Sequence, residues 1–157
     1  MEIQYMSRAN AISYCKEAHL AKTAIISIST PNREYTEAPF ATTANGVQDI
    51  LFLSFADIDG GDAPVRNIHG GEEPDIMHPC DGYKIRRFVR KNRNVDEIIV
   101  HCDEGKSRSA GIAAALAEYY CDDATIRHTK GVYPNMRCYL TTMRCLKASP
   151  WKAFLDK

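Results

Sequence analysis

Short apolar runs, each bounded by polar or turn-forming residues, dominate the hydrophobic pattern of this chain. Four of them, at residues 3–6, 24–29, 49–55 and 97–100, predict strands. The later runs are compact and rich in Ile, Leu and Val, which is typical of strands buried on both faces of a parallel sheet. The first run is short, and we expect it at an edge of the sheet.

Helical periodicity predicts four helices between and after these strands. The first is capped by Ser7 and ends near residue 18, and the others cover residues 81–92, 109–120 and 136–148. Two predicted apolar faces are Ile85, Phe88 and Val89 in the second helix and Leu140, Met143 and Leu146 in the last, which Pro150 ends. Strands alternating with helices indicate one α/β domain over residues 1–157, with a central, mostly parallel sheet flanked by helices.

Two segments lack any periodicity and are expected to be loops, residues 32–46 and residues 57–79. The second is rich in glycine, proline and acidic residues. Loops of that length are uncommon unless they are functional or disordered. Two interpretations therefore stay open for residues 57–79, a lid over a functional site and a surface insertion without a role.

Composition narrows the partners and the compartment. Twenty basic and twenty acidic residues cancel in a chain of 157, so we expect neither nucleic acid nor a membrane as partner. No apolar run is long enough to span a bilayer, and the first residues do not have the pattern of a signal peptide. The six cysteines form no Cys-x-x-Cys pair, so reduced thiols and a cytoplasmic location are expected. The oligomeric state is not indicated.

Residues 101–109, His-Cys-Asp-Glu-Gly-Lys-Ser-Arg-Ser, lie between a predicted buried strand and a predicted helix. Backbone N–H groups in a tight loop that enters a helix N-terminus form an anion site, which the helix dipole strengthens. Cys102 at the floor of this loop would be stabilised as the nucleophilic thiolate. Arg108 offers a planar fork for two phosphoryl oxygens, and Gly105 lets the backbone approach the ligand.

This spacing, His-Cys, five residues, then Arg-Ser, resembles the signature of the Cys-dependent protein tyrosine and dual-specificity phosphatases. Residues 50–57 look like the strand that delivers the family's general-acid aspartate. Residues 133–135, Tyr-Pro-Asn, look like the Pro-Asn that follows the active-site helix in many dual-specificity members. The similarity covers most of the chain from about residue 24, and it implies a protein tyrosine phosphatase-like fold and a phosphocysteine intermediate.

The resemblance also implies roles for particular residues. Cys102 would be the nucleophile, and Ser109 would donate a hydrogen bond to its thiolate. His101 and Asn135 would support the loop. The phosphate-binding residues would be Asp103, Glu104, Gly105, Lys106, Ser107 and Arg108. This chemistry implies no metal and no cofactor.

The general acid has more than one candidate. A carboxylic acid would protonate the leaving oxygen and then accept a proton from water. Asp57 ends a predicted buried strand and matches the family's hydrophobic–x–Asp ending, so we favour it over Asp59; Asp62 follows closely. The family's acid usually lies nearer to the cysteine in sequence, and all three could instead be turn-forming aspartates.

Lys106 and a basic helix leave other substrates open. Some lipid phosphatases of this superfamily carry Lys at the place of Lys106, whereas acidic side chains of Asp103 and Glu104 at the rim would repel extra phosphates. The predicted second helix holds a basic run, Lys84, Arg86, Arg87, Arg90, Lys91 and Arg93. Such a run is usually a solvated face, and no aromatic residues are interleaved to stack RNA bases.

Two further groups of His and Cys residues are not interpreted as functional sites. Residues His69, His78 and Cys80 match no zinc-binding pattern. Cys121, Cys138 and Cys145 fall at mostly apolar helical positions and are expected in the core.

The leading interpretation is a phosphatase that acts on phosphoprotein, most of all on phosphotyrosine, with dual specificity left open. A phosphoinositide or RNA 5′-triphosphate phosphatase is the alternative within the same chemistry. A pseudophosphatase, which binds phosphorylated partners without turnover, is an alternative of another class. Intact Cys102, Arg108 and Ser109 weigh against it.

Overall fold

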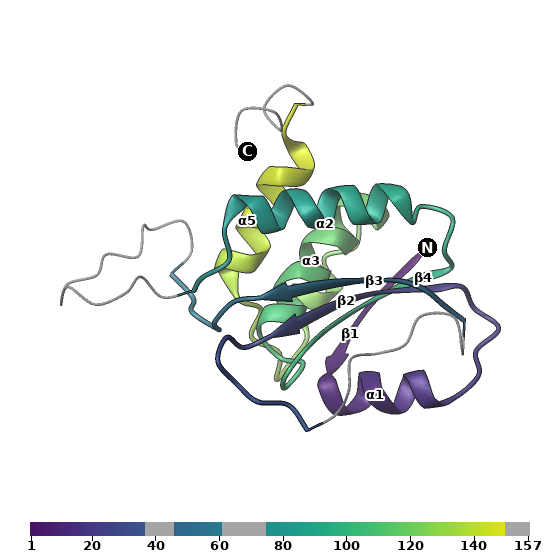
Figure 1. The fold of residues 1–157 in the computed structure, drawn as a ribbon. Helices are drawn as coiled ribbons and strands as arrows, with labels where there is room; N and C mark the ends of the chain where they lie inside the picture. The colour runs from purple at the N-terminus through teal and green to yellow at the C-terminus, as the bar shows by residue number, and fades with distance from the viewer. Residues whose placement is uncertain (37–45, 61–74, 150–157) are drawn as a thin grey trace.

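The structure, a computed structural model, describes residues 1–36, 46–60 and 75–149. Its centre is a four-stranded sheet in the order β1-β4-β2-β3, in which every neighbouring pair is parallel. The strands are β1 (Glu2–Ser7), β2 (Thr23–Ser29), β3 (Val47–Ser54) and β4 (Glu97–Cys102). All four predicted strands are therefore confirmed, and β1 lies at an edge (Figure 1).

Helices cover both faces of this sheet. The helix α1 (Arg8–Lys16) packs on one face (Figure 1). The other face carries α2 (Pro79–Lys91), α3 (Arg108–Cys121) and α5 (Met136–Lys147), and the short α4 (Thr125–His128) follows α3. The predicted class, an α/β domain with a parallel sheet flanked by helices, is confirmed. No hydrophobic pattern predicted α4.

Burial explains why the central strands are so apolar. Every residue of β4 is buried, and so are six of the seven residues of β2. Because side chains alternate along a strand, β4 supplies two separate clusters. Ile98 and Val100 join the main core under α2, α3 and α5, whereas Ile99 packs with Ile25 and Val47 toward α1.

The helices α2 and α5 differ in part from the predicted faces. Ile85, Phe88 and Val89 are buried as predicted. In α5, Leu146 is buried, but Leu140 and Met143 are only partly so. The inner face of α5 is completed by Arg137, Cys138, Tyr139, Thr141, Thr142 and Cys145.

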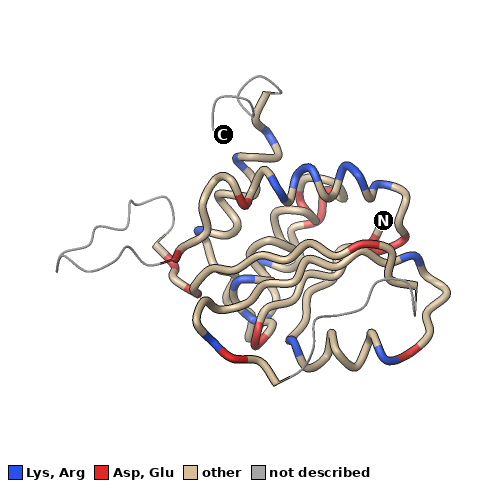
Figure 2. Tube along the Cα trace, viewed as in Figure 1, with Lys and Arg blue, Asp and Glu red and all other residues tan. Residues whose placement is uncertain are grey.

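Two other predictions need correction. Figure 2 shows basic residues along α2, but Arg86 is buried and donates from Nη1 to the Cys145 carbonyl at 3.1 Å, so it is not part of the solvated face. Cys121 is exposed rather than in the core, because it is the last residue of α3. Cys138 and Cys145 are buried as predicted.

Some predictions fall outside the described residues. Residues 61–74 include Asp62 and His69, so the lid and the insertion stay untested interpretations of that segment, and Pro150 also lies outside. Among the described residues, no helix is long and apolar enough to cross a membrane.

The parallel sheet determines where the site is built. All four strands end at the same edge, so the segments that follow them come together there. These segments begin with Arg8 after β1, Thr30 after β2, Phe55 after β3 and Asp103 after β4.

Candidate active site

The loop of residues 102–108, which joins β4 to α3, is held tightly against β1. Gly105 has a φ of +73°, and a Cβ there would lie 2.3 Å from the Ser7 nitrogen and 2.4 Å from the Met6 carbonyl carbon. Gly111, in the first turn of α3, approaches the segment before α5 so closely that a Cβ would lie 2.4 Å from the Asn135 oxygen. Both positions therefore require glycine.

The backbone of this loop is polarised toward anion binding. Three loop carbonyls accept hydrogen bonds from surrounding backbone at 3.0 to 3.2 Å: Asp103 O from Arg8 N, Lys106 O from Tyr133 N and Ser107 O from Asn135 N. Within the part of the chain that the structure describes, the N–H groups of Glu104, Lys106 and Ser107 have no acceptor. A loop with occupied carbonyls and available N–H groups, at the start of a helix, is a site for an oxyanion.

Cys102 lies at the floor of the loop. It is 2% exposed. The Gly105 N–H donates to its Sγ at 3.3 Å, and the Ser109 hydroxyl lies 3.2 Å from the same atom. These are two contacts that a thiolate accepts well, and the structure brings Cys102 and Ser109 together as the sequence predicted.

Arg108 is buried and held by the ends of the neighbouring strands. Its Nη1 donates to the carbonyls of Phe55 at 2.8 Å and Ser29 at 3.4 Å, and its Nη2 donates to Asp103 Oδ2 at 3.0 Å. Its Nε is buried, and the described residues supply no acceptor for it. An unsatisfied buried donor costs about 1–3 kcal/mol, so an oxyanion that accepted from this Nε would remove that cost.

Asp103 is not the rim acid that the sequence suggested. Its side chain is 8% exposed. It accepts from Thr30 Oγ1 at 2.6 Å, Tyr35 Oη at 2.8 Å and Arg108 Nη2 at 3.0 Å. Burial alone would raise the pKa of Asp103, but these hydrogen bonds and the Arg108 charge outweigh it and lower the pKa to about 2. Glu104, by contrast, is exposed as expected.

Asp57 contacts the loop through a side chain. Its Oδ1 accepts from Ser107 Oγ at 2.7 Å and from Asn135 Nδ2 at 2.9 Å. Asp57 is exposed, and so is Asp59, two residues further along. Asn135 is 1% exposed and caps α5, because its Oδ1 accepts from Cys138 N at 3.0 Å. Asn135 therefore links the start of α5 to the candidate acid.

His101 is fully buried beside the loop. Its Nδ1 lies 3.3 Å from the Cys102 carbonyl oxygen. Burial lowers the pKa of His101 from 6.5 to about 4, so the ring is neutral at ordinary pH. This position suits the predicted supporting role rather than proton transfer.

In the described part of the chain, metal-ligating side chains do not gather in one place. Among the described residues, no group of three or more His, Cys, Asp or Glu side chains could hold a metal ion. His78 caps α2, and Cys80 is an exposed residue in the first turn of that helix. Lys106 is exposed.

Comparison with known proteins gives distant structural likenesses. No protein-family model matches the chain, and no curated protein matches it. The human tyrosine phosphatase-like serine/threonine/tyrosine-interacting protein has a TM-score of 0.45 and 18% identity, over 97% of this chain and 88% of that chain. PTPMT1 has a TM-score of 0.47 and 20% identity, over 86% of this chain and 82% of that chain. Likeness at this level says nothing about activity, so function rests on the geometry of the loop.

Proposed function

We propose that this protein hydrolyses phosphate monoesters through a phosphocysteine at Cys102, with protein phosphotyrosine as its preferred substrate. One observation carries the proposal. A buried sulfur contacts the N–H of Gly105 and the hydroxyl of Ser109, in the same loop as the buried Arg108 Nε that lacks an acceptor among the described residues. A phosphate monoester suits both the sulfur and the guanidinium, because its phosphorus is electrophilic and its oxygens accept hydrogen bonds.

In the first step, the Cys102 thiolate attacks phosphorus. The S–P bond forms while the ester P–O bond breaks. Arg108 and the loop N–H groups stabilise the three non-bridging oxygens as charge moves onto them. Asp57 donates its proton to the leaving oxygen, so the alcohol or phenol departs neutral.

In the second step, water attacks the phosphocysteine. The Asp57 carboxylate accepts a proton from that water, inorganic phosphate forms, and the S–P bond breaks. The Ser109 hydroxyl donates to the departing Cys102 sulfur, which leaves as a thiolate. The 3.2 Å between the two side chains supports this role.

Asp57 is assigned as the acid because of its contacts. Ser107 and Asn135 both donate to Oδ1, so Oδ2 is the oxygen that carries the proton in the first step. These donors belong to the 102–108 loop and to the cap of α5, and they hold the acid beside the loop. Asp59 is the alternative two residues further along.

The burial of Cys102 below the protein surface supports a preference for phosphotyrosine. Cys102 is only 2% exposed, so its sulfur lies below the surface of the protein. A phosphotyrosine reaches further than a phosphoserine because a ring separates the phosphate from the peptide backbone. The longer side chain is therefore the better match.

The test is turnover of phosphotyrosine, phosphoserine and phosphothreonine peptides beside inositol phosphates and triphosphate-ended RNA. We expect kcat/KM for phosphotyrosine peptides to exceed that for phosphoserine peptides by about tenfold. Binding of phosphopeptides without turnover would show a pseudophosphatase. Hydrolysis confined to inositol phosphates or RNA would replace the protein substrate.

A further inference from the structure

A basic cavity, here called the side cavity, lies beside the 102–108 loop. Its volume is about 420 Å³. Three basic side chains line it, Arg8, Lys16 and Arg33, together with Tyr35 and Asp103. Figure 2 shows basic residues at both ends of α1, where Arg8 and Lys16 are the first and last residues. The catalytic steps proposed above do not use these cations.

Contacts fix two of the three cations. The Arg8 guanidinium lies 3.8 Å from the centre of the Tyr35 ring, and Arg33 lies 5.6 Å from it. Both also pair with Asp103, Arg8 Nε at 3.6 Å and Arg33 Nη1 at 3.2 Å. The 3.6 Å contact is an ion pair too long for a hydrogen bond, and the described residues offer Arg8 Nε no hydrogen-bond acceptor. The charges of Arg8 and Arg33 are therefore positioned by contacts within the protein.

The charges in the side cavity are unbalanced. Of the described residues that line it, Asp103 alone is a carboxylate, and it also pairs with Arg108. At least two positive charges therefore remain uncompensated among the lining residues. A phosphate monoester carries nearly two negative charges at neutral pH, which matches this excess better than a single carboxylate does.

Size and wall chemistry favour an aromatic phosphate. The cavity is much larger than a phosphate group and falls within the range of ligand-binding pockets. Tyr35, Ala9 and Ile12 supply apolar surface beside the cations. Asp103 lines the cavity and pairs with Arg108, so the cavity adjoins the 102–108 loop through a carboxylate that is already paired. An extended peptide can place one phosphotyrosine in each of the two places, whereas adjacent phosphates on an inositol ring are held close together.

We propose that the side cavity binds a second phosphotyrosine of the same peptide substrate while the first occupies the 102–108 loop. This inference rests on the proposed phosphatase function. The preferred substrate class is then a doubly phosphorylated peptide, and Arg8, Lys16 and Arg33 determine that preference.

The test compares kcat/KM for peptides of one sequence with one or two phosphotyrosines, the second placed on either side of the first. We expect at least one doubly phosphorylated peptide to be preferred by about tenfold, the equivalent of about 1.4 kcal/mol. Arg33→Gln and Lys16→Gln, made separately, should each lower that ratio severalfold. Lys147→Gln removes the same charge from α5 and should leave the ratio unchanged.

Equal kcat/KM for all peptides would overturn the proposal, and so would an equal fall of the ratio in Lys147→Gln. A charge-dependent preference found only among inositol bisphosphates would overturn the peptide assignment. Binding of the same peptides to Cys102→Ser protein separates this inference from the proposed function. Tighter binding of a doubly phosphorylated peptide, lost in Arg33→Gln, would support the side cavity even if the wild-type protein hydrolysed no peptide.

Discussion

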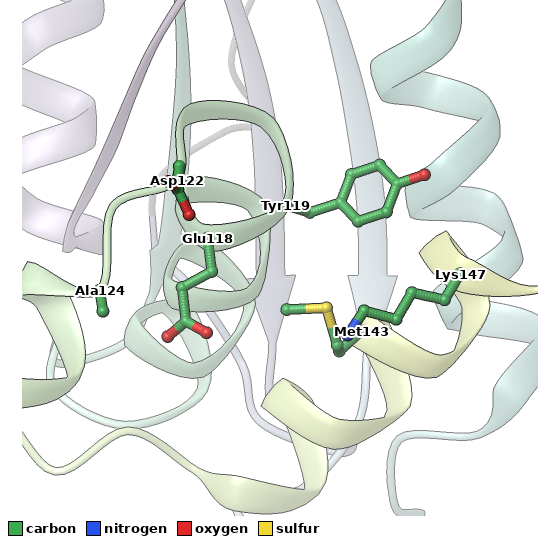
Figure 3. Close-up of a pocket in the computed structure, with 6 residues that line it drawn as sticks. All are labelled: Glu118, Tyr119, Asp122, Ala124, Met143 and Lys147. Carbon is green, nitrogen blue, oxygen red and sulfur yellow. The ribbon is translucent and has the colours of Figure 1, made fainter.

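The two ends of α3 differ in how completely their polar groups are paired. At the first end, Arg108 Nε and several loop N–H groups have no acceptor among the described residues. At the last end, Glu118 accepts from the Tyr139 hydroxyl at 2.6 Å and from Arg127. A pocket of about 350 Å³ lies there, lined by Glu118, Tyr119, Asp122, Ala124, Met143 and Lys147 (Figure 3).

A cavity alone therefore does not indicate a functional site. The helix dipole favours anions at the first end of α3 and disfavours them at the last. At the last end the acidic side chain of Glu118 is neutralised by Arg127, so its charge needs no ligand. At the first end the donors are held in place, but the described residues supply no acceptors for them. We therefore place the chemistry where buried donors lack acceptors.

Among variants at the two ends of α3, Arg108→Lys should have the largest effect. An ammonium cannot make the two-pronged contact with phosphoryl oxygens, so kcat/KM for an aryl phosphate should fall by about 10²- to 10³-fold. The matched control is Arg127→Lys at the other end of α3, which should leave kcat/KM unchanged. Equal losses in the two variants would mean that the ends of α3 do not differ in function.

Asp57→Asn should come next. Loss of the proton donor should slow esters with poor leaving groups by about 10²-fold and slow good leaving groups less. Asp122→Asn at the other end of α3 is the matched control. If Asp59→Asn shows these changes and Asp57→Asn does not, the acid is Asp59.

His101 makes stability sensitive to acid. The folded protein binds a proton on this ring only below about pH 4, whereas the unfolded chain binds it below 6.5. Stability contributed by the neutral ring is thus complete above pH 6.5 and is lost as pH falls toward 4, with about 2 kcal/mol lost between pH 7.5 and 5. Urea unfolding at both values measures this loss.

The control is His128→Asn, since His128 is an exposed residue of α4 near the last end of α3. It should keep the pH dependence, and His101→Asn should reduce it. An NMR titration of the His101 ring gives a second measure that needs no variant. Protonation of the folded ring near pH 6.5 would contradict the lowered pKa of His101 and the predicted loss of stability in acid.

Glu118→Gln should have the smallest effect. It weakens the contacts with Arg127 and Tyr139, so the free energy of unfolding should fall by about 1 kcal/mol. Because these contacts lie at the last end of α3, kcat/KM should not change. A loss of activity as large as that of Asp57→Asn would give the second pocket a part in the reaction.

The sequence predicts the strands well because a buried strand is a short, continuous apolar run, which is a local pattern. Runs such as that at residues 97–100 need no knowledge of partners to be recognised as buried strands. Cys121 was misplaced because periodicity does not show where a helix leaves the core. The short α4 was missed because four residues are too few to show a helical period.

The candidate site is predictable only where it is continuous in sequence. Cys102, Arg108 and Ser109 belong to one loop, so their spacing reveals them. Thr30 and Tyr35 hold Asp103 from a segment some 70 residues away, and no motif connects them. One signal could have found them. Strands of a parallel sheet end at the same edge, so the residues that follow β1 and β2 are expected beside the 102–108 loop.

Cys102 is proposed as the nucleophile in a site that binds oxyanions through other groups. Cys102→Ser separates these two functions, by turnover of an aryl phosphate and by the Kd for tungstate in the same preparation. Turnover should fall by about 10⁴-fold or more, while the Kd for tungstate should stay within about threefold, because Arg108 and the loop N–H groups remain. Turnover near that of the wild-type protein would contradict the cysteine mechanism.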